Sequence, residues 1–523
     1  MTRRLGLLVA LLVALWACSL WAQGPAETLP PGEVPTATND GKSVEEREAP
    51  APPSDSSAQP TRAVAAPESS SSPGPVPAAT SAPAEPPPMF DLVQTPWGPG
   101  RKTSGEKFSS SAVPLPPGPF RLGGDSWSLG FGAQYFARGE LRDNRDFDGA
   151  VGDHELGVDQ RARVTVRGSA FGRVGVYVEL QDVRVWGSEP NTVTTTPNTG
   201  LHQGFVDWKA TDWLDVRVGR QELSYGEDRL IGNLDWAQSA RAFDGVFVRF
   251  APSATTTVDA FAMMLRPPAW VTPTAGQRLH NSGQFFYGAY GRLRPSKALG
   301  VDAYALGLHN DAGTASSGPG PDTNLATLGA RVAWSPGALA LVGEGVFQSG
   351  QQGSALILAG AFAARGTYTF AAPGKWYVGG EVLGASGDGD ATDATQRTFN
   401  QLFPTGHVHL GFMDYVGWQN VVGFKGTVGV RPLGAHVWLD VHHFRFWDPR
   451  GASYTAAGAQ FVAANPLRTN GNLGTELDLS ATLPISAHLA LSGTFAVFLP
   501  GGGAQSRGSS PSTWGFLSVR TQL

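Results

Sequence analysis

Three arginines recur at close spacing in the stretch RARVTVRG, and apolar residues occupy positions between them. Successive side chains of an extended strand point to opposite faces, so Arg161, Arg163 and Arg167 share one face. Val164 and Val166 occupy the other. A guanidinium is a permanent cation whose planar donors match a carboxylate, so this row could bind or guide anions. The pattern fits a soluble sheet with one wet face, and also a membrane barrel with arginines in a water-filled interior.

The densest group of polar residues lies in the stretch 216–250, which begins with strand-like alternation and then loses it. The polar positions after this change are Arg220, Gln221, Glu222, Asp228, Arg229, Asn233, Asp235, Arg241 and Asp244. The sequence contains no Gly-x-Ser-x-Gly elbow, no His-Glu-x-x-His and no phosphate loop. It therefore predicts a protein that is not an enzyme, with a hydrolase of dispersed residues as an open alternative.

The composition indicates an exported β-rich chain. Glycine accounts for 67 of 523 residues, roughly twice its usual share. The single cysteine, Cys18, lies near the N-terminus, so no internal disulfide is expected. The net charge of −5 argues against a nucleic-acid partner.

The first 120 residues are expected to contain no folded domain. Arg3 and Arg4 precede an apolar run that is too short to span a bilayer, which predicts a signal peptide over residues 1–22. Lipidation at Cys18 is an alternative, because the residues before it resemble a lipobox. Residues 23–120 form a Pro/Ala/Ser-rich arm that cannot bury a core, and we expect it to be disordered and periplasmic.

Residues 121–523 are expected to form one β-domain. Period-two alternation runs from Asp125 to the last residue and gives about 18 candidate strands of roughly 10–14 residues. A closed antiparallel barrel absorbs so many strands without an exposed edge. The last strand ends on apolar Leu523, as a barrel-assembly signal would. The fold prediction is an all-β transmembrane barrel in the outer membrane, with membrane lipid and the barrel-assembly machinery as partners.

Four segments resemble the alginate-export family of outer-membrane porins. They are GRQELSYGEDRLIGNLDW, ARAFDGV, FNQLFPTGHVHLGFMDYVGWQN and LGTELDLSATLPISAHLALSGTFAVFLPG. The resemblance covers roughly residues 125–523. It implies an 18-stranded barrel whose narrow, positively lined lumen passes an anionic polysaccharide by diffusion, together with periplasmic polysaccharide-export partners. A porin for small anionic solutes and a plugged barrel that serves as an enzyme or surface anchor are the alternatives.

The predicted constriction combines arginines with nearby acids that would keep binding weak enough for release. The arginines are Arg161, Arg163, Arg167, Arg217, Arg220, Arg229 and Arg249, and the acids include Asp159, Glu179, Asp207 and Asp215. Rings of cations in a low-dielectric tunnel concentrate anions. In the competing interpretation, these arginines pair with Asp and Glu to fill the barrel interior.

One loop has the spacing of a calcium site. Asn144, Asp146, Asp148 and Glu155 occupy positions 1, 3, 5 and 12 of such a loop. The first position is Asn rather than Asp, and strands flank the loop where an EF-hand has helices. We therefore favour an external acidic loop without a cofactor, with a structural calcium ion as the alternative.

Overall fold

The computed structural model describes residues 121–523, apart from residues 125, 151, 188–198, 267–268, 272–278, 282, 312–321 and 391. The expected signal peptide (1–22), the proline-rich arm (23–120) and Cys18 lie outside these residues. Within them, no helix is both long and apolar enough to cross a membrane.

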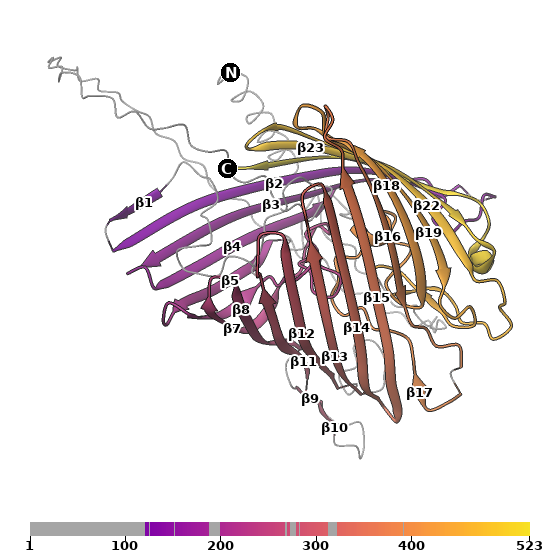
Figure 1. The fold of residues 1–523 in the computed structure, drawn as a ribbon, viewed down its shortest axis with the longest axis horizontal. Helices are drawn as coiled ribbons and strands as arrows, with labels where there is room; N and C mark the ends of the chain where they lie inside the picture. Colours follow the sequence, from indigo (N-terminus) through magenta and orange to yellow (C-terminus); the bar gives the residue numbers. More distant parts are fainter. Residues whose placement is uncertain are drawn as a thin grey trace, which may run out of the picture. The chain divides into compact units, whose positions relative to one another are not determined.

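Eighteen strands of the described chain form a closed antiparallel barrel (Figure 1). They are β2 (Trp127–Asp143), β3 (Glu155–Ala170), β4 (Val174–Val185), β5 (Thr199–Lys209), β6 (Leu214–Gln221), β7 (Phe243–Ser253), β8 (Thr256–Arg266), β11 (Gln284–Leu293), β12 (Leu299–Asn310), β13 (Thr323–Trp334), β14 (Leu339–Gln352), β15 (Ala355–Thr369), β16 (Tyr377–Ala385), β18 (Val421–Val430), β19 (His436–Phe446), β22 (Asn472–Ser486), β23 (Leu489–Pro500) and β24 (Ser512–Gln522). The barrel closes where β24 pairs with β2, from Gln134↔Gln522 to Asp143↔Thr513. The predicted fold class is confirmed.

The remaining elements are short. Strand β1 (Arg121–Gly124) pairs with the start of β2, and β17 (Thr395–Gln396) runs parallel to β15. The connections also hold β9 (Ala269–Val271), β10 (Leu279–Asn281), β20 (Ser453–Tyr454), β21 (Gln460–Val462), α2 (His407–Leu410), η1 (Pro432–Gly434) and η2 (Gly502–Arg507).

Short turns and long loops alternate along the chain, except that a two-residue turn (353–354) joins β14 to β15 at the end where the long loops lie. The barrel therefore has a short-turn end and a long-loop end. The β3–β4 turn shows why the short turns form: Phe171 and Gly172 both adopt positive φ, at 54° and 63°. Two successive residues of this kind match the right-handed twist of a hairpin. Strand β2 begins at the short-turn end and β24 finishes there.

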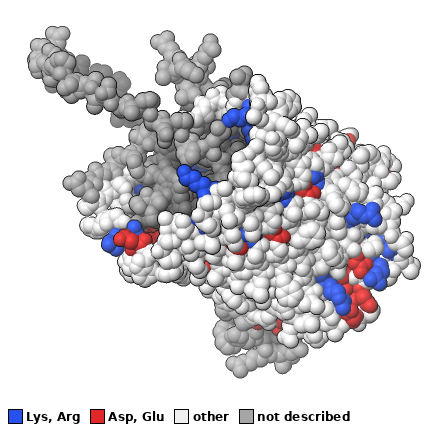
Figure 2. Space-filling model, in the orientation of Figure 1, with Lys and Arg blue, Asp and Glu red and all other residues white. Residues whose placement is uncertain are grey.

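The side chains alternate between the two faces as predicted. Arg161, Arg163 and Arg167 are 1–3% exposed, whereas Val164 is 56% exposed on the outside. Charged side chains are sparse on the face of the molecule in Figure 2. Exposed tryptophans stand at the strand ends of the short-turn side, namely Trp127, Trp208, Trp213, Trp334 and Trp376. An apolar outer surface bordered by aromatic residues is typical of a barrel in a membrane.

Two long loops supply much of the buried core. The β6–β7 loop (residues 222–242) contributes Leu223, Ile231 and Trp236, and the β16–β18 loop (residues 386–420) contributes Phe399 and Phe412. These residues belong to one hydrophobic cluster with inward-facing side chains of the barrel wall. The barrel interior is therefore occupied by folded chain.

Candidate functional site: two inward loops and an arginine cluster

The two inward loops are bound to each other through their backbones. The N–H of Gly232 donates to Phe403 O (2.8 Å), and the N–H of Phe403 donates to Leu230 O (2.9 Å). Ile231 and Phe403 form a parallel bridge at this place. A side chain at Gly232 would meet Thr405 Oγ1 at 2.3 Å, which explains glycine at this close approach. The loops thus form one unit inside the barrel.

Arg241 ties the same two loops together. Its Nη1 donates to the carbonyl oxygens of Gly232 (3.0 Å) and Pro404 (3.1 Å). Burial lowers the pKa of Arg241 to about 10. The side chain stays a cation at neutral pH and cross-links the backbones of the two loops.

The β16–β18 loop is also bound to the barrel wall. The N–H of Met413 donates to Glu476 Oε1 (2.8 Å), and Gln348 Nε2 donates to Asn400 O (2.8 Å). Burial, followed by the nearby Arg229, lowers the pKa of His409 to about 3. The neutral ring therefore donates from Nε2 to Glu227 O, at 2.8 Å. This histidine joins the two loops without adding charge.

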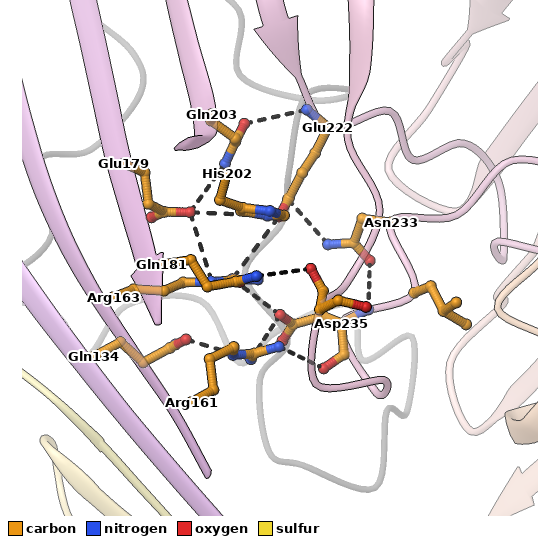
Figure 3. A network of polar contacts seen from close by, with 12 residues as sticks. Gln134, Arg161, Arg163, Glu179, Gln181, His202, Gln203, Glu222, Asn233 and Asp235 are labelled. Carbon is orange, nitrogen blue, oxygen red and sulfur yellow. Dashed lines mark hydrogen bonds and ion pairs between the residues drawn. The ribbon is translucent and has the colours of Figure 1, made fainter. Parts of the chain in front are cut away.

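Three guanidinium groups of the wall meet a single carboxylate of the β6–β7 loop, that of Asp235. Figure 3 shows two of them, Arg161 and Arg163, beside Asp235. Asp235 Oδ1 accepts from Arg161 Nη2 (2.8 Å) and Arg163 Nη1 (3.1 Å), and Oδ2 accepts from Arg520 Nη2 (3.1 Å). Arg161 and Arg163 lie on β3, and Arg520 lies on β24. We call Arg161, Arg163 and Arg520 the arginine cluster.

Arg161 also holds the backbone of the loop. Its Nη1 lies 3.3 Å from the carbonyl oxygens of Asp235, Ala237 and Gln238. Nearby, Arg138 stacks 4.0 Å above the ring of Trp236 and donates to Trp236 O at 3.0 Å. Arginines of the wall therefore bind this part of the loop at the carboxylate of Asp235, at the ring of Trp236 and at several backbone carbonyl oxygens.

One group of three side chains has the geometry to hold a metal ion. Candidate ligand atoms of Glu179, His202 and Glu222 lie within 4.8 Å of one another, the one such set among the described residues. His202 Nε2 already bonds Glu222 Oε1 at 2.8 Å. Glu179 accepts from the hydroxyls of Thr165 and Tyr177, each at 2.9 Å.

A cation disfavours a metal at this group. The guanidinium of Arg163 lies 3.9 Å from both Glu179 Oε1 and Glu222 Oε1. A divalent ion between these carboxylates would stand close to that positive charge. The three side chains are best described as part of the network that holds the β6–β7 loop to the wall.

Other predicted arginines pair with acids of neighbouring strands. Arg217 Nε binds Asp207 Oδ1 at 2.7 Å, and Arg167 Nη2 lies 3.6 Å from Asp207 Oδ2. Arg249 binds Asp259 with both Nε (2.6 Å) and Nη2 (2.8 Å). Asp215 is buried and stands opposite Arg249 in the ladder.

The Arg249–Asp259 pair belongs to a belt in which the sign of the charge alternates from strand to strand. The belt runs along β7, β8, β11, β12, β13, β14, β15, β16 and β18 and consists of Arg249, Asp259, Arg292, Asp302, Arg331, Glu344, Arg365, Glu381 and Lys425. Ladder neighbours of opposite charge include Arg292↔Asp302, Arg331↔Glu344 and Glu381↔Lys425. We call these nine residues the ion-pair belt.

The other predicted residues lie apart from the arginine cluster. Asp159 accepts from Arg138 at 3.0 Å. Arg229 lies on the β6–β7 loop and binds Glu381 at 2.8 Å. Arg220 follows the outward register of Val218 and pairs with Asp244, which faces the same way. The structure therefore does not bring Arg220 to the interior group.

The calcium-loop residues have other partners. Asn144 Nδ2 donates to Pro511 O at 2.8 Å, and Glu155 binds Arg145 at 2.8 Å. Asp146 and Asp148 each accept from backbone two residues further on. No metal-competent trio of the described chain includes them.

Several residues of this site were not predicted to lie in it. The sequence gives no signal that assigns Arg520 to this site, and Asp235 stands out only as one of a run of polar residues. His202 and the β16–β18 loop received no role. The available signal was the apolar content of both loops, because Leu223, Ile231 and Phe412 stand where no strand alternation exists.

The sequence profile of the family described as alginate export matches residues 127–516. This range covers most of the chain and nearly the whole barrel.

The chain belongs to the alginate export family.

Solved structures with a similar fold come from two bacteria. OccAB2 of Acinetobacter baumannii has a TM-score of 0.50 and 9% sequence identity, and the match covers 75% of this chain and 98% of that one. OpdQ of Pseudomonas aeruginosa has a TM-score of 0.49 and 12% identity over 76% of this chain and 98% of that one. No curated protein matches. Family and fold together identify this member of the alginate export family as an outer-membrane channel.

Proposed function

We propose that this channel passively conducts an anionic oligosaccharide or polysaccharide, such as a polyuronate. The proposal rests first on one observation, the three guanidinium groups that converge on the carboxylate of Asp235 inside the barrel. A polyuronate carries one carboxylate per sugar, and a guanidinium binds a carboxylate through two parallel hydrogen bonds. Membership in the alginate export family supports the same substrate class.

The surrounding acids are expected to keep each binding step weak. Glu179 and Glu222 lie 3.9 Å from Arg163, so part of its charge is already compensated. Conduction needs sites that attract a substrate but also release it. We infer that a bound sugar can move on because its carboxylate competes with those of the protein. In this role the channel performs no catalysis and needs no cofactor.

A channel for small anionic solutes is a second candidate, and one observation favours it. The ion-pair belt is close to neutral, and the two inward loops occupy the interior. A small solute could pass such a lumen with less loop movement than a polymer. A plugged barrel that serves as an enzyme or surface anchor is a third candidate.

The orientation follows from general properties of such barrels. Outer-membrane barrels have short periplasmic turns and longer extracellular loops. We therefore propose that the short-turn end faces the periplasm. The proline-rich arm (23–120), which precedes β1, would then lie in the periplasm. Polysaccharide-export partners and the barrel-assembly machinery would meet the chain on the same side.

Single-channel recording in planar bilayers tests the proposal. The purified protein should give discrete current steps, and an oligogalacturonate should interrupt the current at lower concentration than a malto-oligosaccharide of equal length. Equal interruption by both sugars would favour the small-solute candidate. The absence of current steps would favour a plugged barrel.

A further inference from the structure

We propose that Asp235 is an internal substitute for the substrate carboxylate. In this proposal, which rests on the proposed function, the arginine cluster is a carboxylate-binding site that the β6–β7 loop occupies itself. An acidic sugar displaces Asp235, takes over its guanidinium contacts and releases the loop.

The first support is the excess of hydrogen-bond donors. Among the ion pairs of the described residues, Asp235 is the one acidic partner of Arg161 and of Arg520. Arg161 Nε, Arg163 Nη2 and Arg520 Nε are buried and have no hydrogen-bond partner within the described residues. The cluster therefore has more donors than Asp235 can use, and a second carboxylate could engage them.

The second support is access. The side chain of Arg161 is fully buried, whereas that of Asp235 is 25% exposed. The wall side of the contact is fixed by the barrel, and the loop side is open to water. A ligand from the lumen would therefore meet Asp235 first and could take its place without disturbing the strands.

The third support is the backbone of the loop. Asp228, Leu234 and Ala240 adopt positive φ values of 60°, 50° and 53°. A non-glycine residue in this region of backbone conformation is strained, and the surrounding contacts must hold it there. Leu234 precedes Asp235 directly, so loss of the Asp235 contacts would let this strained segment relax.

Exchange of one carboxylate for another explains why the Asp235 contact would open for an acidic sugar and not for a neutral one. Removal of Asp235 without a replacement would leave buried cations uncompensated, which is strongly unfavourable. An incoming uronate restores the same charge and can accept hydrogen bonds from the same guanidinium groups. A neutral sugar cannot do so, and it should leave the loop in place.

The test compares Asp235→Asn with two matched variants in planar bilayers. Asp235→Glu keeps the carboxylate, and Asp244→Asn removes an acid from the outward-facing pair with Arg220. Asp235→Asn should raise the conductance without sugar several-fold. It should also lower the half-blocking concentration of oligogalacturonate about 10-fold, which corresponds to about 1.4 kcal/mol. Asp244→Asn should behave like the unaltered channel. Asp235→Glu, which keeps the carboxylate, should change conductance and block less than Asp235→Asn does.

The outcomes separate this inference from the proposed function. If the unaltered channel prefers oligogalacturonate but Asp235→Asn matches Asp244→Asn in conductance and block, the inference alone is wrong. If the unaltered channel treats acidic and neutral oligosaccharides alike, the proposed function fails and this inference fails with it.

A second variant decides the question if Asp235→Asn does not insert. Arg520→Gln removes one donor that both carboxylates would share. It should raise the half-blocking concentration of oligogalacturonate several-fold and leave that of the malto-oligosaccharide unchanged. An unchanged value for oligogalacturonate would overturn the proposal.

Discussion

The arginine cluster and the ion-pair belt use the same residue types in opposite ways. In the belt, each basic residue faces acids of neighbouring strands, as Arg249 faces Asp259 through two hydrogen bonds. In the cluster, Arg161, Arg163 and Arg520 share the carboxylate of a loop. The belt links strand to strand along the wall, although Glu381 and Arg365 also bind Arg229 and Glu227 of the β6–β7 loop. The cluster links the wall to the loop through Asp235.

This difference indicates that the belt contributes to the stability of the barrel, whereas the cluster can respond to a substrate. The strand-to-strand partners in the belt are fixed by the barrel ladder, so these pairings change only if the barrel unfolds. The partner of the cluster lies on a loop, and a loop can move while the barrel stays intact. A substrate can therefore influence the cluster at much lower cost than it can influence the belt.

The largest effect is expected from reversal of charge in the cluster. The double variant Arg161→Glu with Arg163→Glu places two new carboxylates beside Asp235, which should repel the β6–β7 loop and lower anion selectivity. The barrel should still insert, because the outward face of β3 is unchanged. The measurement is the reversal potential across a salt gradient, and an unchanged potential would contradict the role of these arginines in the lumen.

A belt variant should change stability more than selectivity. Asp259→Asn removes the partner of both Arg249 and Arg292. Breaking a buried pair in this way costs about 3 kcal/mol. The urea midpoint of unfolding, followed by the gel mobility of the folded barrel, should fall, with only a small shift in reversal potential. A normal midpoint together with strongly altered selectivity would remove the distinction between belt and cluster.

The loop region should respond to pH near neutrality. Burial, together with nearby Glu222 and Glu227, raises the pKa of Asp228 from 3.8 to about 7, against the opposing charge of Arg241. Its contribution to the packed loop is fully present below the ordinary pKa and is lost as pH rises through 7. Conductance should therefore increase between pH 5 and pH 8.

Asp228→Asn is the control for this pH effect. Glu227 does not contribute in that range, because Arg365 and Arg229 outweigh its burial and hold its pKa at about 2. The variant should flatten the conductance profile between pH 5 and pH 8. A profile that keeps its shape in Asp228→Asn would assign the pH effect to another group.

The smallest effect is expected from the outward-facing pair. Asp244→Asn breaks the contact with Arg220, whose side chain is 38% exposed. Exposed pairs contribute under about 1 kcal/mol. The conductance and the urea midpoint should both stay close to those of the unaltered protein, and a clear change in either would mean that Arg220 reaches the lumen after all.

The sequence was sufficient to predict the barrel and the orientation of β3. Strand alternation is a local property with a period of two residues, so inward Arg161 and outward Val164 follow from their spacing alone. The contact between Arg161 and Asp235 joins residues 74 positions apart and depends on a loop that turns into the barrel. No local pattern encodes such a contact.

The partners of the arginines could not be predicted from local sequence patterns either. Arg220 and Arg217 are three positions apart and were grouped as constriction candidates, yet they face opposite sides of the wall. Whether an inward arginine is paired depends on the neighbouring strand, as with Arg249 and Asp259 in the β7–β8 ladder. Register between strands fixes these pairs, and register was not available from alternation alone.

The most direct test of the proposed function is selective release from proteoliposomes. Vesicles that contain the full-length protein would be loaded with an oligogalacturonate and a malto-oligosaccharide of equal length, and the release of each would be followed over time. We predict that the acidic oligosaccharide leaves faster, and that Arg161→Glu with Arg163→Glu abolishes this preference. Equal release of both sugars, or retention of both, would contradict a channel for anionic saccharides.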